Sequence, residues 1–311
     1  MKAAQIDNYG DASDIQIREV EKPQISDDQV LVEVTASSLN PFDSTVRSGG
    51  AHGMAPMNFP GTLGADFVGT IAEIGANVTG FSVGDRVYGQ SNALFGASGA
   101  FAEFTATNSG SIALAPSNVN DEEAASLPLA GVSALQAIVD HLNLQSGQKL
   151  FINGGTGGIG STAIQIAKNI GAYVAVTTSS DNVEYAKSLG ADEVIDYKSQ
   201  DYTEVIHDYD AVLNNVYNDE TDKLLTVLKK GGIAVSLANG FDESKVNELG
   251  VTGISQMTHV STKSLDELRE LVEQGVVEVK IDKVFPLDQI KEAFTVRENE
   301  SIKGKVVITI K

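Results

Sequence analysis

The chain has 311 residues, enough for two domains, and 42% of them are hydrophobic, enough to build a buried core. Its formal net charge is −20, and so acidic a surface repels nucleic acid and anionic lipid, which excludes both as main partners. The sequence has no cysteine, which excludes disulfides, thiolate zinc sites, iron–sulfur clusters and a cysteine nucleophile. No stretch approaches the ~18 apolar residues of a membrane span, and the N-terminal segment lacks an apolar run, so we expect a cytoplasmic protein.

The first third of the chain has the pattern of short β-strands. Gln29–Ala36, Phe67–Ile74 and Phe101–Thr107 are rich in valine, phenylalanine and threonine, and turns with glycine separate them. Short strands with frequent turns favour a small antiparallel barrel over a parallel sheet.

The pattern changes near Asn118. Helical patterning begins at Asp121–Ala125 and continues, interrupted at Pro128, to about His141. Strands and helices then alternate, which is typical of βαβ units in a parallel sheet. The expected strands are Lys149–Asn153, Tyr173–Thr177, Glu193–Ile195, Ala211–Leu213 and Ile233–Leu237. The expected helices are Ser161–Ile170, Asn182–Leu189 and Glu220–Lys229, followed by Ser264–Gln274, Leu287–Arg297 and a last strand, Lys305–Ile310.

The strongest local motif is NGGTGGIG at Asn153–Gly160, between an expected strand and an expected helix. In its Gly155-x-Gly157-x-x-Gly160 spacing, the first glycine permits a tight turn, the second lets a pyrophosphate approach, and the third lets the helix pack on the sheet. The phosphate would lie at the helix N-terminus. We therefore expect a dinucleotide held by Gly155, Thr156, Gly157, Gly158, Ile159 and Gly160. The alternative is a glycine-rich turn in an α/β protein that binds no nucleotide.

The same loop also fits the glycine spacing of short-chain dehydrogenases, Gly154-x-x-x-Gly158-x-Gly160. That family uses a tyrosine with a lysine four positions later as its acid. None of the eight tyrosines here has such a lysine, so this class is excluded.

The residues after the second strand of the parallel sheet bear on which dinucleotide is bound. An NAD site usually has a carboxylate about 20 residues beyond the glycines, but here Thr177 is followed by Thr178, Ser179 and Ser180, with no carboxylate before Asp181. Hydroxyls can donate to a 2′-phosphate, which favours NADP(H). The alternative is that these residues form a turn and cap the next helix. Because no arginine occurs between Arg86 and Arg269, a 2′-phosphate would need a lysine from elsewhere.

Several short motifs along the chain, in this order and spacing, resemble zinc-independent medium-chain dehydrogenase/reductases of the quinone oxidoreductase type. They are Ser38-Leu39-Asn40-Pro41-x-Asp43 with Arg47, Gly64-Ala65-Asp66-Phe67-x-Gly69, Val83–Val87, Gly99–Glu103, Leu127–Ala134, the glycine loop, Leu189–Asp192, Ile195–Tyr197 and Lys230–Gly232. The resemblance covers essentially the whole chain. It implies an α/β architecture in which a GroES-like barrel domain (1–118), completed by a C-terminal segment (262–311), surrounds a doubly wound Rossmann domain (119–261).

The departures from zinc-dependent relatives point to the chemistry. Those relatives have Cys at the position of Asn40, His at Ala65 and Cys near Ala130, and a four-Cys lobe where this chain has a short loop near Gln90–Ala100. We therefore expect no metal and no Lewis-acid polarisation of a carbonyl. Quinones and conjugated enones remain suitable acceptors, because hydride goes to carbon and hydrogen-bond donors can stabilise the charge on oxygen.

The resemblance also implies site residues. Asn40 would lie beside the nicotinamide and the acceptor oxygen, Asp43 would orient Asn40 or Arg47, and Thr45 would hold a water where many quinone reductases have Tyr. Other positions implied near the cofactor are Ser133, Thr178, Ser179, Ser180, Tyr197, Val216, Leu237 and Asn239. Lys303 and Lys305 lie near a position where some relatives place a base for the 2′-phosphate, although solvated surface lysines would explain both.

The sequence thus predicts an NADPH-dependent reductase of quinones or enones. The alternatives are a non-catalytic NADPH-binding scaffold or regulatory protein, and a zinc-free alcohol or enoyl-thioester reductase. We also expect a homodimer, in which an edge strand within Gly253–Val260 pairs with its copy, because an uncovered apolar edge strand is an association surface.

Overall fold

The computed structural model describes residues 1–54, 56–91 and 98–311, and the chain divides into two compact units. The barrel unit consists of Met1–Ala130, Val260–Glu273 and Val279–Lys311, and the Rossmann unit of Gly131–His259 and Gln274–Glu278. The division therefore falls within helix α3 (Pro128–Leu135) and not after residue 118. The physical reason is that helix α2 (Asp121–Ala125) packs on strands of the barrel.

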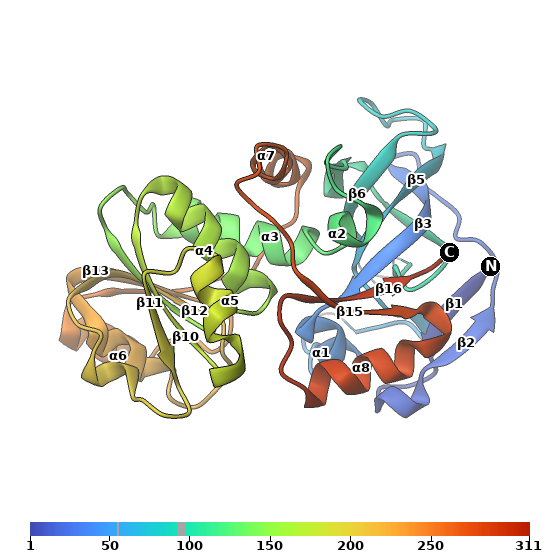
Figure 1. Cartoon of the computed structure of the whole chain (residues 1–311). Helices are drawn as coiled ribbons and strands as arrows, with labels where there is room; N and C mark the ends of the chain where they lie inside the picture. Colours follow the sequence, from blue (N-terminus) through green and yellow to red (C-terminus); the bar gives the residue numbers. More distant parts are fainter. Residues whose placement is uncertain (55, 92–97) are drawn as a thin grey trace. The chain divides into compact units, whose positions relative to one another are not determined.

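The barrel unit is built on a seven-stranded sheet with the order β15-β16-β3-β5-β6-β8, in which β7 also pairs with β3 (Figure 1). Its strands are β3 (Gln29–Leu39), β5 (Asp66–Ile74), β6 (Arg86–Gln90), β7 (Phe104–Asn108), β8 (Ile112–Leu114), β15 (Ile281–Pro286) and β16 (Lys305–Thr309). All pairs are antiparallel except β15 with β16, as the short, turn-rich strands predict. The two C-terminal strands thus belong to the sheet that the first part of the chain begins.

Besides α2, a smaller sheet and further helices belong to the barrel unit. The sheet has the order β2-β1-β4, with β1 (Lys2–Ile6), β2 (Gln16–Glu19) and β4 (Gly61–Thr62). The helices are α1 (Pro41–Ser48), α7 (Thr262–Glu273) and α8 (Ile290–Asn299). Leu39, Phe101 and Phe294 are buried in one apolar cluster, so the C-terminal helix α8 shares the core of the N-terminal strands.

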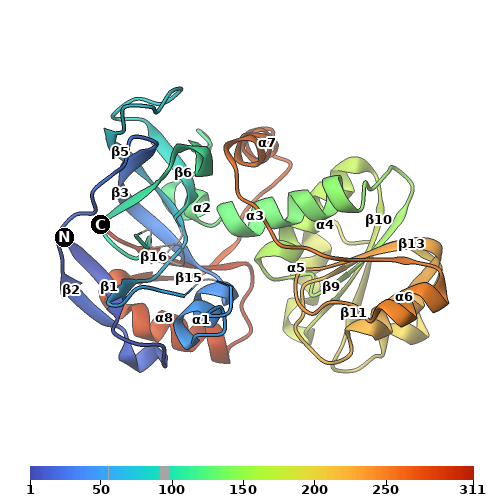
Figure 2. The same cartoon turned by 180° about the vertical axis from the view of Figure 1, so that it is seen from behind.

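The Rossmann unit has six parallel strands in the order β11-β10-β9-β12-β13-β14. They are β9 (Lys149–Asn153), β10 (Tyr173–Thr178), β11 (Glu193–Asp196), β12 (Tyr209–Asn214), β13 (Leu228–Ser236) and β14 (Thr252–Ser255). Helices α4 (Gly158–Ile170) and α5 (Val183–Ser188) lie on one face, and α6 (Glu243–Leu249) lies on the other (Figures 1 and 2). The strand order reverses between β9 and β12, and ligands bind open α/β sheets at the carboxyl end of such a point.

Two expectations for this unit need correction. The helix expected at Glu220–Lys229 is a short 3₁₀ helix, Thr221–Val227, because Leu228 already pairs with Tyr209 in the parallel sheet. The edge strand expected within Gly253–Val260 is β14, which ends at Ser255. The expected loop near Gln90–Ala100 falls largely on residues 92–97, outside the described residues.

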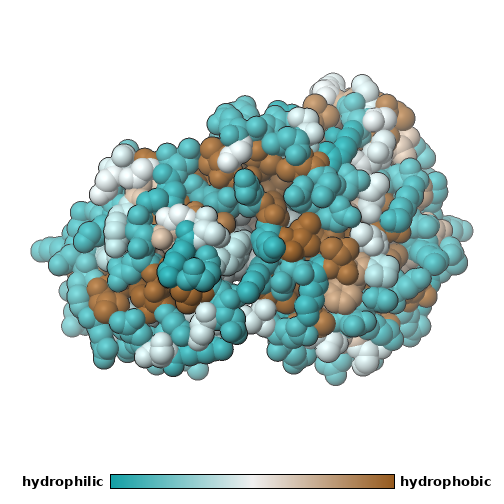
Figure 3. Space-filling view, viewed as in Figure 1, coloured by the Kyte–Doolittle hydropathy of each residue, from teal (hydrophilic) through white to brown (hydrophobic). Residues whose placement is uncertain are grey.

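The surface of the molecule in Figure 3 is largely hydrophilic. Hydrophilic side chains cover most of the face seen in Figure 3, with separate hydrophobic groups between them. In the described part of the chain, no helix is both long and apolar enough to cross a membrane.

Candidate functional site

The glycine loop joins β9 to α4 at the carboxyl edge of the parallel sheet. Gly154 has a φ of +85°, so the tight turn requires glycine there and not at Gly155, as the sequence suggested. A Cβ on Gly155 would lie 2.7 Å from Val176, and one on Gly160 would lie 2.1 Å from the Gly154 carbonyl oxygen. Both glycines therefore serve close packing inside the unit.

Gly157 differs from its neighbours because its surroundings are open. It is the N-cap of α4, and a Cβ built on it would meet nothing within 4 Å. The free N–H groups and the positive end of the helix dipole lie beside this open position. This arrangement fits an anionic group such as a pyrophosphate.

A row of buried polar side chains fixes the strand ends beneath the loop. The Thr177 hydroxyl donates to Asn153 Oδ1 (2.7 Å), Asn153 Nδ2 donates to Asn214 Oδ1 (3.0 Å), and Asn214 Nδ2 donates to Ser236 Oγ (3.1 Å). The row crosses β10, β9, β12 and β13 in turn. The loop is tied to the same row, since the Gly154 N–H donates to Thr177 Oγ1 (2.9 Å).

The hydroxyls at the end of β10 are not equally free. The Thr178 and Thr156 hydroxyls share a hydrogen bond of 2.7 Å, and the Ser180 hydroxyl donates to Asp196 Oδ2 at 2.6 Å. Ser179 Oγ is buried and has no partner among the described residues. Of the three residues 178–180, Ser179 therefore offers the hydroxyl best placed to serve a ligand.

Asp196 adds a carboxylate at this edge of the sheet, beyond the residues up to Asp181 on which the sequence prediction rests. It ends β11, pairs in register with Thr178, and so brings a carboxylate beside Ser180 from the neighbouring strand. The hydrogen bond from Ser180, followed by that from the Lys198 N–H, lowers the pKa of Asp196 below its usual range, so the carboxylate stays ionised at neutral pH. A negative charge therefore stands beside Ser180.

The remaining expected cofactor positions have diverse surroundings. Ser133 is buried and its hydroxyl pairs with that of Thr258 (2.7 Å), whereas Tyr197 is exposed. The Val216 N–H donates to Asn214 Oδ1, the Leu237 N–H donates to the Asn214 carbonyl, and Asn239 Nδ2 donates to the Asn218 carbonyl.

Sequence reasoning missed Asn215, which directly follows β12. Both polar atoms of its side-chain amide are buried without a partner among the described residues. An orphaned amide at the carboxyl edge of the sheet fits a bound polar ligand. The open Gly157, the free Ser179 hydroxyl and this amide together fit a dinucleotide.

In the barrel unit, Asn40 lies at the junction of β3 and α1 and is only 3% exposed. Its Oδ1 accepts from Lys305 Nζ (2.5 Å), and its Nδ2 donates to Asp66 Oδ2 (2.9 Å). Its backbone N–H donates to Asp43 Oδ2 (2.7 Å). Asn40 is therefore part of a buried polar cluster that contains one lysine and two carboxylates.

The cluster bears on the expectations for Lys305, Thr45 and Asp43. Lys305 is not a surface lysine, since its side chain is buried. Within the described part of the chain, the hydroxyl of the exposed Thr45 donates to the Pro41 carbonyl of its own helix and not to Asn40. Asp43 holds the Asn40 backbone but not Arg47, which bonds to the Gly10 carbonyl and Glu298 instead.

The electrostatics of the cluster follow from burial. Burial, with a smaller contribution from the nearby charge of Asp66, raises the pKa of Asp43 to about 7 against the opposing hydrogen bonds from Asn40 and the charge of Lys305. Burial also raises the pKa of Asp66 and lowers that of Lys305. Asp66 nevertheless accepts from Asn40, Gln90 Nε2 and the Leu129 N–H, which is the environment of an ionised carboxylate.

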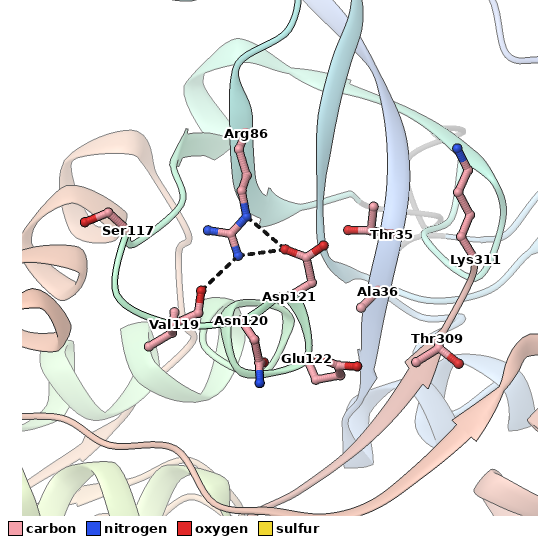
Figure 4. A pocket seen from close by; sticks show the side chains of 10 residues that line it. All are labelled: Thr35, Ala36, Arg86, Ser117, Val119, Asn120, Asp121, Glu122, Thr309 and Lys311. Atoms are coloured by element: carbon pink, nitrogen blue, oxygen red, sulfur yellow. Dashed lines mark hydrogen bonds and ion pairs between the residues drawn. The ribbon is translucent and has the colours of Figure 1, made fainter.

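A separate groove on the barrel unit, about 630 Å³ in volume, is lined by residues other than those of this cluster (Figure 4). Arg86 is its largest cation, but the guanidinium is already bonded to Asp121 and to the carbonyls of Pro116 and Val119. Lys311, the other cation that lines the groove, is paired with Glu33, so both cations among the described lining residues are already engaged.

The described residues contain no group of three or more His, Cys, Asp or Glu side chains that could hold a metal ion. Asn40, Ala65 and Ala130, which the resemblance places at or near the zinc-ligand positions, supply no thiolate or imidazole.

The chain is similar to two known protein families and to several known proteins. Residues 26–117 match the family described as alcohol dehydrogenase GroES-like domain, and residues 189–308 match the family described as zinc-binding dehydrogenase. Among curated proteins, the chain is 34% identical to 2-methylene-furan-3-one reductase of Solanum lycopersicum and 32% identical to the chloroplastic NADPH-dependent alkenal/one oxidoreductase of Arabidopsis thaliana. Each match covers 99% of this chain and 79% of the relative.

Among solved structures, the chain is similar to the quinone oxidoreductase from Coxiella burnetii. The TM-score is 0.91 at 28% sequence identity, and the match covers 100% of this chain and 99% of the other.

Proposed function

The chain belongs to the medium-chain dehydrogenase/reductases of quinone oxidoreductase type, and from this premise we propose that it reduces quinones or conjugated enones without zinc. It is an oxidoreductase and its cofactor is NADP(H), as its relative the NADPH-dependent alkenal/one oxidoreductase indicates. The observation that carries the proposal is the buried Asn40 amide. By the resemblance it stands where zinc-dependent relatives have a metal ligand, and its Nδ2, which carries two N–H bonds, donates to Asp66 and lies near the Asp43 carboxyl.

The Rossmann unit supplies the groups that would hold the cofactor. The open loop at Gly157, with the N–H groups of α4, suits the pyrophosphate, and the unpartnered Ser179 hydroxyl and Asn215 amide suit polar groups of the dinucleotide. When bound, the reduced nicotinamide supplies a hydride.

The role of the chain's own residues in this step is to stabilise the negative charge that develops on the acceptor oxygen. Asn40 donates its second N–H to that oxygen as negative charge develops on it. An amide is too weak an acid to give up a proton, so the last proton comes from solvent.

The direct test is NADPH oxidation with a panel of quinones and enones, monitored by the loss of NADPH absorbance. Turnover with quinones or enones and not with simple ketones supports the proposal. NADPH binding without turnover on any acceptor would identify a non-catalytic scaffold instead, and turnover of simple ketones alone would identify an alcohol dehydrogenase.

We expect the activity to survive chelators. The residues at the three ligand positions of the zinc-dependent relatives are Asn40, Ala65 and Ala130, and none of them binds zinc tightly. Protein purified without added metal should contain far less than one equivalent of zinc by elemental analysis and should keep its activity after dialysis against EDTA. Stoichiometric zinc, or activity lost to EDTA and restored by zinc, would contradict this expectation.

We expect the chain to form a homodimer through β14. This strand is the edge of the parallel sheet, and its residues from Thr252 to Ser255 are mostly exposed. Pairing with a second copy would satisfy the backbone groups along this edge. Light scattering at micromolar concentration should give the mass of a dimer, and replacing Ile254 by proline should shift it toward the monomer. A monomer in the unaltered protein would refute the prediction.

The carboxylate of Asp196 should limit the preference for NADPH over NADH. We expect Asp196→Asn to tighten NADPH severalfold, because it removes a negative charge beside Ser180, and to leave NADH nearly unchanged. Fluorescence titration of each cofactor with the free protein measures both constants. The matched control is Asp192→Asn. Asp192 directly precedes β11, at the opposite end of that strand from Asp196, and is paired with Lys168. Equal changes for NADPH and NADH would show that Asp196 does not face the 2′ position.

A further inference from the structure

Lys305 is the one lysine among the described residues whose side chain is buried, and its place is fixed by the backbone before it. Gly304 has a φ of +82°, and a Cβ there would lie 2.0 Å from the Lys280 carbonyl oxygen. The Lys305 N–H donates to that same carbonyl at 2.9 Å, and β16 begins here. The close approach that only glycine allows therefore anchors the residue that carries the ammonium group.

The ammonium group has two neighbours in the cluster. It donates to Asn40 Oδ1 at 2.5 Å, and it lies 3.9 Å from Asp66 Oδ2. Asp66 is fully buried, so the two charges are shielded from water. Burying an ammonium group costs free energy unless the group is paired with an opposite charge. The nearby Asp66 carboxylate explains why the buried Lys305 is tolerated, but it does not explain why the ammonium group contacts the uncharged Asn40 amide.

The contact with the amide has a chemical consequence. An ammonium group can only donate hydrogen bonds, and a carboxylate can only accept them. Lys305 therefore requires the oxygen of the Asn40 amide on its side, and Asp66 requires the nitrogen on the other. An amide held between a donor and an acceptor cannot flip by 180° without losing both hydrogen bonds. Its second N–H therefore points in one fixed direction.

We infer that Lys305 is a positioning residue, which acts through Asn40 by holding the amide in the orientation in which its second N–H can donate to the acceptor oxygen. This inference rests on the proposed function, because it assigns Lys305 a task in the same site. It also removes Lys305 as a ligand for the 2′-phosphate, since its ammonium group is buried and already bonded to Asn40.

The test is a double-mutant cycle on kcat with a quinone acceptor such as 9,10-phenanthrenequinone. Lys305→Met keeps the length of the side chain and removes the donor, and we expect kcat to fall by about tenfold or more while the NADPH dissociation constant stays within about twofold. In the Asn40→Ala background, the same substitution should change kcat by less than about twofold, because its route of action is already gone. Lys283→Met, on the neighbouring strand β15, removes the same charge from a half-exposed site and should leave kcat unchanged.

A purely structural role for Lys305 gives a different pattern. Lys305→Met would then lower kcat by the same factor in both backgrounds, together with the folded fraction measured by circular dichroism. That additive result overturns the inference. If Lys305→Met does not fold, Lys305→Arg takes its place in the cycle, because the larger guanidinium keeps the charge but cannot make the same single contact with Asn40.

Failure of the proposed function is separately visible. If no acceptor of the panel supports NADPH oxidation by the unaltered protein, the proposed function fails. The orientation of the amide can then be followed without turnover, from the side-chain NH₂ resonances of Asn40 in ¹⁵N-labelled protein. Resonances that shift and broaden in Lys305→Met but not in Lys283→Met support the positioning role. Resonances that are the same in both variants overturn it.

Discussion

Replacing Gly157 by valine is expected to abolish NADPH binding while the fold survives. A Cβ at this position meets no protein atom within 4 Å, so the folded chain accommodates a larger side chain. The same open space is the face of the loop next to the N-terminus of α4, where a pyrophosphate would approach the free N–H groups. A valine side chain would fill that approach.

The neighbouring glycines provide the contrast. Gly160→Val should fail to fold, because its Cβ would lie 2.1 Å from the Gly154 carbonyl oxygen. Gly110→Val, at another position with no atom within 4 Å but in the barrel unit, should leave NADPH binding unchanged. Fluorescence titration measures binding, and circular dichroism with thermal melting measures the fold. An unchanged NADPH titration in Gly157→Val would mean that the cofactor binds elsewhere.

The sequence predicted the Rossmann unit well because its signals are local. Lys149–Asn153 is a short apolar run followed at once by the glycine loop, and both the strand and the helix after it are found where the pattern places them. Alternation of strands and helices restricts the topology to a parallel sheet, and the observed strand order obeys that rule. Here each element is specified by residues within or beside it.

The polar cluster of the barrel unit could not be predicted in the same way. Asn40 and Lys305 are separated by 265 positions and meet because β16 pairs with β3, which places Val306 opposite Leu39. A lysine next to a glycine near the end of a chain looks like a surface residue, and only the pairing of distant strands buries it. Asp196 was missed for a similar reason, since its carboxylate reaches the end of β10 from the neighbouring strand.

Replacing Asn40 by alanine is expected to lower kcat with a quinone by well over tenfold, with little change in NADPH affinity. Asn40 belongs to the barrel unit and the glycine loop to the Rossmann unit, so the cofactor-binding groups named above are untouched. Loss of a main hydrogen-bond donor to a developing oxyanion costs roughly 2.7–4 kcal/mol, or about 10²–10³ in rate. The Asn40 amide is a candidate for such a donor because its orientation is already fixed by Lys305 and Asp66.

The same substitution also removes a partner from a buried lysine and a buried carboxylate, and its effect on stability must be separated from its effect on rate. Asn40→Ser serves this purpose, because serine is a preferred residue at the start of a helix such as α1 but is too short to reach both Lys305 and Asp66. If the amide stabilises the acceptor oxygen, both variants lose kcat to a similar extent whatever their melting temperatures. If kcat stays within about twofold in a folded variant, Asn40 only shapes the junction of β3 and α1, and another group stabilises the oxygen.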